Sequence, residues 1–265
     1  MLYSEYLKAI LLGVIQGVAE FLPISSSGHL VISSELMQSA TGRPLDVRAS
    51  LQMNVALHLG TLISILVVYR RDLTHIVRDF RMCVRLAVAT APIVLLVLVA
   101  HDFIESTLQT AWVSAGGLFV TAGLLSISQR VRTRDLSSEK LPWTSVVLIG
   151  ISQAIAIVPG ISRSGSTISG GLMCGLRRDE ASRFSFLIAI PAIAGAVVWE
   201  TRKILQGEGG GNSPDVLLLG AMTAFIVGLL ALRLLIRMVN AGRLHWFAWY
   251  CVVVGTATFT WLSLR

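Results

Sequence analysis

Charge is scarce in this chain of 265 residues, since only 14% of them are Asp, Glu, Lys or Arg. A soluble domain typically carries about 25% charged residues. Hydrophobic residues make up 54% of the chain, and the mean hydropathy is +0.73. This composition excludes an ordinary soluble domain and indicates a polytopic membrane protein.

Cysteine is also scarce, and the three copies lie in or beside apolar segments. Their number is odd, and their spacing fits neither a disulfide framework nor a zinc site. We expect each to be a small buried hydrophobe. The chain also lacks a basic patch interleaved with aromatic residues, so its net charge of +7 does not indicate a nucleic-acid partner. Excess Lys and Arg are typical of cytoplasmic loops that face anionic lipid.

Long apolar stretches are abundant. A transmembrane helix needs about 20 apolar residues, and six stretches are near that length. Two further apolar stretches, 7–35 and 144–175, are interrupted by Pro, Gly and Ser, which weaken a continuous helix. Irregular backbone at membrane depth must be buried in protein or line a wet cavity. We therefore predict an all-α polytopic membrane protein with two re-entrant helix–loop–helix hairpins and six transmembrane helices, at 51–69, 84–100, 111–128, 184–200, 216–233 and 246–263.

The basic residues predict the topology. Most of the 22 lie in four stretches, which we predict to be cytoplasmic. The first hairpin then enters the membrane from outside, and the second enters from inside. The four stretches are 70–85, 130–140, 177–183 and 233–243.

The two hairpins share a sequence motif. Because they enter from opposite faces, we predict an inverted-topology repeat within a single membrane domain, with repeat one at about 1–128 and repeat two at about 144–265. Such folds place their site near the midplane, where broken helices meet. The identical pairs are Gly13/Gly150, Gln16/Gln153, Ala19/Ala156, Ile24/Ile161, Ser25/Ser162, Ser27/Ser164 and Gly28/Gly165.

Glu20 is the acidic residue that lies well inside an apolar hairpin. An ionisable residue at membrane depth indicates function, although neighbouring donors could also simply satisfy it. Gln16 lies four residues earlier on the same helical face. Gln16 and Glu20 are therefore candidate ligands for a divalent cation, Mg²⁺ or Ca²⁺, which prefers oxygen.

The stretch Pro23-Ile-Ser-Ser-Ser-Gly-His29 predicts a turn that leads into a short helix. Hydroxyls and free N–H groups at a helix start favour anions. Ser26 or Ser27 is a candidate nucleophile if His29 or Glu20 removes its proton. By themselves, the serines would indicate a capping turn. Their occurrence beside an intramembrane acid favours a site.

The second hairpin repeats the serine turn and adds Arg163. A guanidinium is always charged and grips phosphate oxygens with a planar fork. It suits a pyrophosphate and the charge that develops in phosphoryl transfer. A mere ion pair with Glu20 is the alternative, but it would not explain two Ser/Gly loops.

These residues resemble the bacterial undecaprenyl-diphosphate phosphatase family, also called bacitracin-resistance proteins. The resemblance covers essentially the whole chain, and segments 57–61 and 184–191 also match. Its two main motifs are Gln16-xxx-Glu20-Phe-Leu-Pro-Ile-Ser-Ser-Ser-Gly-His29 and Pro159-Gly-Ile-Ser-Arg-Ser-Gly-Ser-Thr-Ile-Ser-Gly-Gly171.

The resemblance implies an enzyme that hydrolyses undecaprenyl diphosphate to undecaprenyl phosphate with the help of a divalent cation. This reaction recycles the lipid carrier for peptidoglycan synthesis, cell wall biogenesis and cell shape, and it confers bacitracin resistance. The implied location is the bacterial cytoplasmic (inner) membrane, with the active site on the periplasmic side. The implied partners are the polyprenyl diphosphate and membrane lipid, and a homodimer is left open.

The site residues carry over by motif position. Gln16 and Glu20 take the metal-ligand positions, although many family members have Glu where this chain has Gln16. The resemblance implies that Glu20, Ser26, His29 and Arg163 are catalytic. The groups that would hold the phosphates are Ser25, Ser27, Ser162, Ser164, Gly165 and Thr167.

A flippase or transporter for polyprenyl phosphate is the alternative function, because inverted repeats with broken helices are a transporter design. The hydroxyl, carboxylate and imidazole of the first motif favour an enzyme. Two reaction routes stay open. In one, Ser26 forms a phosphoryl-serine that water hydrolyses; in the other, water attacks directly with His29 or Glu20 as base.

Overall fold

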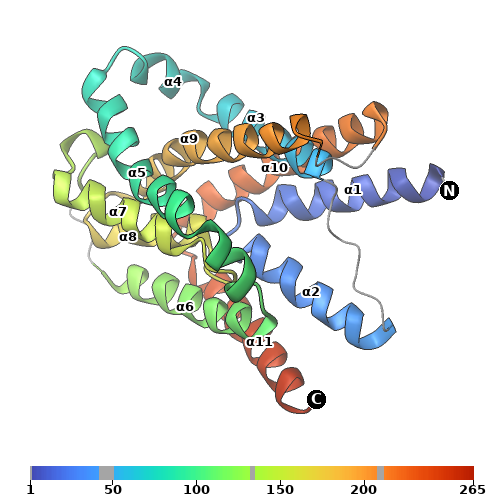
Figure 1. Ribbon diagram of the computed structural model, residues 1–265. Coiled ribbons are helices and arrows are strands. Elements are labelled where there is room, and N and C mark those ends of the chain that lie inside the picture. The colour runs from blue at the N-terminus through green and yellow to red at the C-terminus, as the bar shows by residue number, and fades with distance from the viewer. Residues whose placement is uncertain (1, 42–50, 132–134, 208–211) are drawn as a thin grey trace.

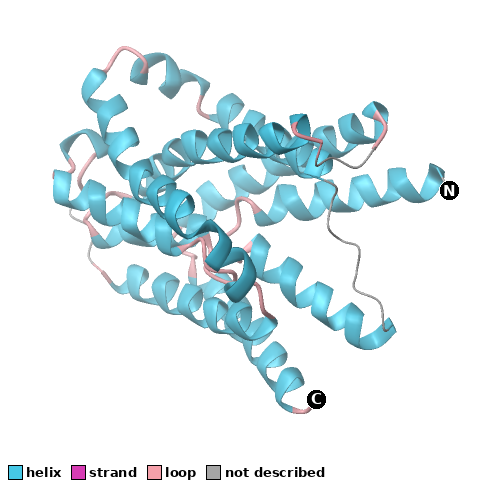
Figure 2. Cartoon of the chain, in the orientation of Figure 1, coloured by secondary structure: helices cyan, strands magenta, loops and turns pink. Residues whose placement is uncertain are grey.

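The computed structural model describes residues 2–41, 51–131, 135–207 and 212–265, and these are helices joined by loops (Figures 1 and 2). Within these ranges, the extended backbone pairing is limited to an isolated bridge between Leu136 and Leu176. The helices are α1 (Leu2–Ala19), α2 (Ser26–Thr41), α3 (Leu51–Val68), α4 (Arg70–Ile76), α5 (Phe80–Phe103), α6 (Ala111–Arg130), α7 (Trp143–Ile155), α8 (Arg163–Met173), α9 (Arg178–Leu205), α10 (Pro214–Asn240) and α11 (His245–Ser263), with short turns of π-helix at Ile104–Leu108 and 3₁₀-helix at Ser138–Lys140.

Among the described residues, five helices are long and apolar enough to cross a membrane: α3, α5, α6, α9 and α10. The prediction of an all-α polytopic membrane protein is confirmed. Five of the six predicted spans are among these helices, and α11 (His245–Ser263) forms a continuous helix at the sixth predicted position, 246–263. Its sequence includes His245, three threonines and four Trp and Tyr residues among its apolar side chains.

Both interrupted stretches form a helix, a loop and a second helix, as their Pro, Gly and Ser residues predict. Residues 20–25 join α1 to α2, and residues 156–162 join α7 to α8. Each loop contains one residue in the left-handed region, Ser25 at φ 65° and Gly160 at φ +90°. Glycine adopts this conformation readily, whereas a serine needs its surroundings to hold it there.

The first loop is anchored in the core by an aromatic side chain. Phe21 is fully buried, and its ring packs edge-on against Phe186 of α9 with centroids 5.8 Å apart. Tyr69, at the end of α3, stacks on the same ring at 6.2 Å. Buried aromatic pairs add stabilisation beyond their area. The loop is thus held inside the helix bundle.

The four basic stretches of the sequence meet at one end of the bundle. The first of them, 70–85, contains α4 and the start of α5. Packing between distant segments therefore gathers most of the basic residues in one place, and the side of the membrane on which they lie stays a prediction. The contacts that join the stretches are the ion pair Asp72–Arg183 at 2.7 Å, the backbone bridge Leu136–Leu176 and the packing of the Arg178 guanidinium against Gly242.

Glu180 is a buried carboxylate at this end of the bundle. Its Oε2 accepts hydrogen bonds from the backbone N–H of Ser138 at 2.9 Å and from the Ser138 hydroxyl at 2.6 Å. Its Oε1 lies 3.2 Å from the Arg183 guanidinium. Glu180 thereby ties the segment before α7 to the start of α9.

Glu180→Ala should lower the free energy of unfolding in detergent by about 1–3 kcal/mol, because it leaves buried donors without an acceptor. Thermal melts of the purified variant would measure this loss. The matched control is Glu139→Ala, which removes an exposed carboxylate from the same region. Equal melting temperatures for the two variants would contradict the role of Glu180.

Candidate functional site

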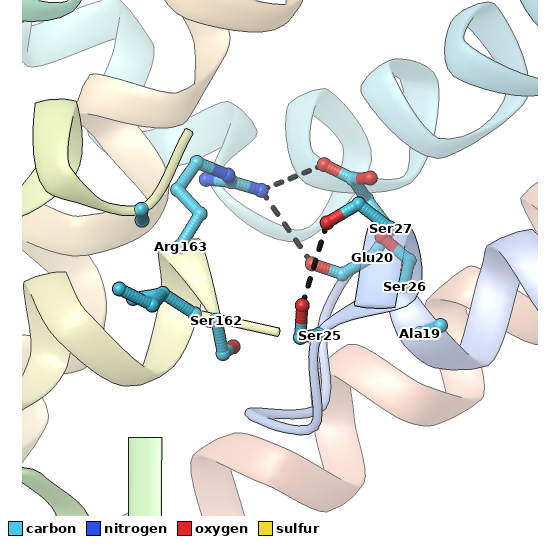
Figure 3. Close-up of a pocket in the computed structure, with 9 residues that line it drawn as sticks. Ala19, Glu20, Ser25, Ser26, Ser27, Ser162 and Arg163 are labelled. Carbon is cyan, nitrogen blue, oxygen red and sulfur yellow. Dashed lines mark hydrogen bonds and ion pairs between the residues drawn. The ribbon is translucent and has the colours of Figure 1, made fainter. Parts of the chain in front are cut away.

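A small polar pocket lies where the two loops meet, beside the first residues of α2 and α8 (Figure 3). Its volume is about 120 Å³. Both sequence motifs contribute residues to it, as expected for a pocket built from two segments that are distant in sequence. The lining residues are Ala19, Glu20, Ser25, Ser26, Ser27, Ala156, Ile161, Ser162 and Arg163.

Each helix start at the pocket is capped by a serine. The Ser25 hydroxyl accepts from the N–H of Gly28 at 3.3 Å, and the Ser162 hydroxyl accepts from the N–H of Gly165 at 3.2 Å. The first amides of a helix have no partner within the helix, and its dipole is positive at that end. Two such ends at one pocket favour an anion.

Ser25 also joins the two loops to each other. Its hydroxyl accepts a second hydrogen bond, from the N–H of Gly160 at 3.1 Å, and lies 3.4 Å from the Ser27 hydroxyl. Gly28 is in close contact with the backbone of Gly160, since a Cβ there would lie 2.7 Å from the Gly160 Cα. The relative position of the two helix starts therefore depends on Ser25.

Arg163 and Glu20 form an ion pair across the pocket, with Nη2 2.7 Å from Oε1 (Figure 3). The amide nitrogen of Gln16 donates to the other oxygen, Oε2, at 3.0 Å. In the described part of the chain, Nη1 of Arg163 is buried without a partner. An unsatisfied buried donor is costly by about 1–3 kcal/mol. A ligand with acceptor oxygens, such as a phosphate, would satisfy it.

Thr121 of α6 holds the second loop, and no sequence pattern distinguishes it from the other threonines of the spans. It is almost fully buried. Its hydroxyl donates to the carbonyl of Gly160 at 2.8 Å and accepts from the N–H of Ser162 at 2.9 Å. These two bonds set the backbone directly before Arg163.

Thr121→Val keeps the side-chain shape but leaves two buried backbone groups unpaired, which is expected to lower the free energy of unfolding by about 1–3 kcal/mol. Turnover should fall as well, because Arg163 follows the affected backbone. Melting temperature and activity can be measured on one preparation. The control is Thr256→Val on α11, an exposed threonine. Wild-type stability and turnover in Thr121→Val would contradict this role.

Three residues predicted to hold phosphate, Ser164, Gly165 and Thr167, do not line the pocket. The Ser164 hydroxyl lies 3.2 Å from that of Ser162. The Thr167 hydroxyl donates to the Arg163 carbonyl at 2.8 Å and contacts Ser185 of α9. They stabilise the first turns of α8, and direct contact with phosphate stays a prediction for them.

His29, a predicted catalytic residue, does not line the pocket either. Its Nδ1 lies 2.8 Å from the Ser25 carbonyl oxygen, and its Nε2 lies 2.9 Å from the hydroxyl of Tyr250 on α11. The two rings are nearly parallel, with centroids 5.6 Å apart. Tyr250 was not singled out from the sequence, since only the packing of α11 brings it to His29.

A divalent cation at the pocket stays a prediction, and Glu20 is the carboxylate that the pocket offers for it. Among the described residues, no three His, Cys, Asp or Glu side chains gather into a metal cluster. Mg²⁺ commonly keeps several waters and is held by one or two carboxylates together with substrate phosphates. Gln16, the other predicted ligand, does not line the pocket, and its amide nitrogen donates to Oε2 of Glu20.

The five apolar helices and this pocket define a multi-pass membrane protein with a polar pocket shared between two helix–loop–helix segments. The chain belongs to the family described as Bacitracin resistance protein BacA, whose profile matches residues 9–257. The resemblance identified from the sequence motifs is thereby confirmed.

Curated relatives match the chain over nearly its full length. A protein of Rhodopirellula baltica named undecaprenyl-diphosphatase is 41% identical over 254 residues, which is 95% of this chain and 96% of the relative. Proteins with the same name from Rubrobacter xylanophilus and Korarchaeum cryptofilum are 38% and 34% identical, over 93% and 97% of this chain and 94% and 100% of their own lengths.

Proposed function

We propose that this protein is a membrane phosphatase that hydrolyses undecaprenyl diphosphate to undecaprenyl phosphate and inorganic phosphate. The observation that carries the proposal is the pocket at which Arg163, Glu20 and Ser26 meet beside two helix starts. The name undecaprenyl-diphosphatase of the similar proteins supports the substrate. The reaction would recycle the lipid carrier for peptidoglycan synthesis and confer bacitracin resistance.

Arg163 and the two helix starts would bind the diphosphate. The guanidinium offers a free Nη1 and can exchange its bond with Glu20 for phosphate oxygens. The first amides of α2 and α8 add uncharged donors directed at the same space. These groups are fixed before the substrate arrives, so they can stabilise charge that develops during phosphoryl transfer.

The reaction would begin with the Ser26 hydroxyl, at the first position of α2. Its oxygen attacks the terminal phosphorus, its proton passes to Glu20, and the bond to the bridging oxygen breaks to release undecaprenyl phosphate. Water then hydrolyses the phosphoryl-serine. Glu20 is the carboxylate that lines the pocket, whereas both ring nitrogens of His29 have other partners. In the direct route, Glu20 would take the proton from water instead.

Glu20, supported by Gln16, would hold the divalent cation. A bound Mg²⁺ or Ca²⁺ would neutralise charge on the phosphate oxygens. The hydrogen bond from Gln16 keeps the carboxylate oriented toward the pocket. A glutamine at this position also leaves Glu20 as the sole acid of the motif, so the site would rely on the substrate to complete the cation's ligands.

The inverted repeat and the re-entrant hairpins are part of this proposal. α1 of the first repeat packs on α10 of the second, and α7 of the second repeat packs on α5 of the first. A two-fold repeat predicts such reciprocal packing between its halves. The equivalent glycines make equivalent close contacts: a Cβ at Gly13 would lie 2.9 Å from the Gly220 oxygen on α10, and a Cβ at Gly150 would lie 2.6 Å from the Ala89 oxygen on α5. Both hairpin loops meet inside the bundle.

We also propose that the charged end of the bundle faces the cytoplasm of a bacterial inner membrane, by the positive-inside rule. The first hairpin would then enter from the periplasmic side, where the family resemblance places the active site. A flippase with the same pocket was the alternative. None of the contacts described above favours it, and the similar proteins are named for hydrolysis.

Phosphate release by the purified protein tests the function. We expect release from undecaprenyl diphosphate, or from a shorter polyprenyl diphosphate, in detergent with Mg²⁺ or Ca²⁺. Chelation should stop the reaction, and the added cation should restore it. If no phosphate is released with either cation present, the phosphatase proposal fails.

Ser26→Ala separates the two routes. If Ser26 is the nucleophile, turnover should fall by at least about 1,000-fold, because its oxygen forms the covalent intermediate. Mass spectrometry of rapidly quenched wild-type protein should detect phosphate on Ser26. Ser33→Ala, an exposed serine further along α2, is the control. Near-normal turnover by Ser26→Ala would establish the direct attack of water.

A further inference from the structure

The imidazole of His29 is fixed by hydrogen bonds on both nitrogens. Nδ1 lies 2.8 Å from the Ser25 carbonyl oxygen, and Nε2 lies 2.9 Å from the Tyr250 hydroxyl. A carbonyl oxygen can only accept, so Nδ1 carries the hydrogen, and Nε2 of the neutral ring accepts from the phenol. The Tyr250 hydroxyl therefore donates to Nε2 of His29, and Nδ1–H of His29 donates to the Ser25 carbonyl.

Ser25, whose carbonyl oxygen accepts the hydrogen bond from His29, has a backbone conformation that its surroundings must stabilise. Its φ of 65° lies in the left-handed region, which is uncommon for residues other than glycine. Such conformations persist when the surroundings over-determine them. The His29 side chain binds the carbonyl of Ser25, while the Ser25 hydroxyl binds the N–H groups of Gly28 and Gly160.

α11 contacts the first hairpin at two successive residues, Tyr250 and Cys251. Next to Tyr250, the buried thiol of Cys251 donates to the carbonyl of Pro23 at 3.7 Å. α11 also packs along α6, whose Thr121 holds the second loop. One helix close to the C-terminus thus contacts the first loop directly and packs against the helix that holds the second.

We propose that Tyr250 is a positioning residue that acts through His29 and Ser25 on the phosphate cradle. The phosphate cradle is the pair of helix starts at Ser26 of α2 and Arg163 of α8. His29 is then a positioning residue as well, and it carries no proton to or from the reacting atoms. This inference rests on the proposed phosphatase function. It reassigns His29 because the ring is engaged away from the pocket that Glu20 lines.

The first test removes the phenol hydroxyl. Tyr250→Phe should lower kcat/KM for the polyprenyl diphosphate about five-fold, the size expected for one lost hydrogen bond that orients the site. The control is Trp249→Phe, which alters the adjacent aromatic side chain on the exposed face of α11. Identical kcat/KM for the two variants would overturn the role of Tyr250.

The second test distinguishes positioning from proton transfer. Asparagine offers an N–H where His29 has Nδ1, so His29→Asn can still donate to the Ser25 carbonyl, but it cannot carry a proton. If His29 only positions Ser25, His29→Asn should stay within about ten-fold of wild type, whereas loss of a general acid or base typically removes 10²–10⁴-fold. His29→Ala should lose clearly more than His29→Asn. Equal losses of about 10²-fold or more in both variants would show that His29 transfers protons and would overturn the inference.

A spectroscopic measurement keeps the inference testable if the variants are poorly active. In ¹⁵N-histidine-labelled protein, His29 should be the Nδ1–H tautomer, and its Nε2 resonance should shift in Tyr250→Phe but not in Trp249→Phe. An Nε2–H tautomer, or an unchanged Nε2 resonance in Tyr250→Phe, would contradict the bond pattern. Absence of phosphate release by the wild type would instead contradict the phosphatase proposal, and the NMR result would be independent of it.

Discussion

Arg163→Ala is expected to lower kcat for polyprenyl diphosphate hydrolysis by at least about 1,000-fold, since an arginine that stabilises phosphoryl transfer is worth 10³–10⁵. The Arg163 guanidinium is the positively charged group that lines the pocket beside the two helix starts. Its Nη1 is buried without a partner among the described residues. A phosphate-release assay on the purified variant measures the effect.

Two controls make the result specific. Arg177→Ala removes an exposed arginine from the charged end of the bundle, where a surface ion pair contributes little, and it should leave kcat unchanged. Arg163→Lys keeps the charge but loses the planar fork, so it should recover only part of the activity. Because Arg163→Ala leaves Glu20 unpaired, its melting temperature must be compared with that of wild type. A folded variant with normal kcat would contradict the role of Arg163.

Glu20→Gln is expected to reduce turnover by about 10²–10⁴-fold, the range for loss of a general base. The amide keeps the shape of the side chain but cannot accept the proton of Ser26 or water, and it binds a divalent cation poorly. The variant should also need more Mg²⁺ or Ca²⁺ for its remaining activity. Both changes follow from the position of this carboxylate in the pocket, against Arg163 and Gln16.

Glu35→Gln provides the matched control for that experiment. Glu35 is also a carboxylate of the first hairpin, but it lies on α2 and pairs with Arg265 near the end of the chain, at 2.8 Å. Titration of activity against cation concentration should give wild-type behaviour for this variant. If Glu20→Gln shares that behaviour, Glu20 serves neither as base nor as cation ligand.

The helix breaks were predictable because they have local causes. Pro, Gly and Ser within an apolar stretch weaken a helix whatever lies around them, and both loops occur where these residues cluster. The packing of the sixth span was harder to predict. α11 is a continuous helix where a span was predicted at 246–263, but its packing along α6 cannot be predicted from a linear pattern.

The charged groups of the pocket could be predicted from the sequence, whereas the residues that hold its two loops in place could not. The repeat of the motif was enough to anticipate that Glu20 and Arg163 meet, and they form an ion pair. Thr121 and Tyr250 were not anticipated, because helices distant in sequence deliver them. Ser164 and Thr167 share the motif of Ser162 but do not line the pocket: the Ser164 hydroxyl lies beside that of Ser162, and Thr167 contacts Ser185 of α9.

In the proposed function, the two halves of the chain share one diphosphate site. A structure of the protein with a non-hydrolysable polyprenyl methylene-diphosphonate and Mg²⁺ tests it most directly. We predict that the terminal phosphonate lies between the starts of α2 and α8, within about 3 Å of Nη1 of Arg163 and close to the Ser26 hydroxyl. A diphosphonate bound by one hairpin alone, or outside the pocket that Glu20 lines, would contradict the account.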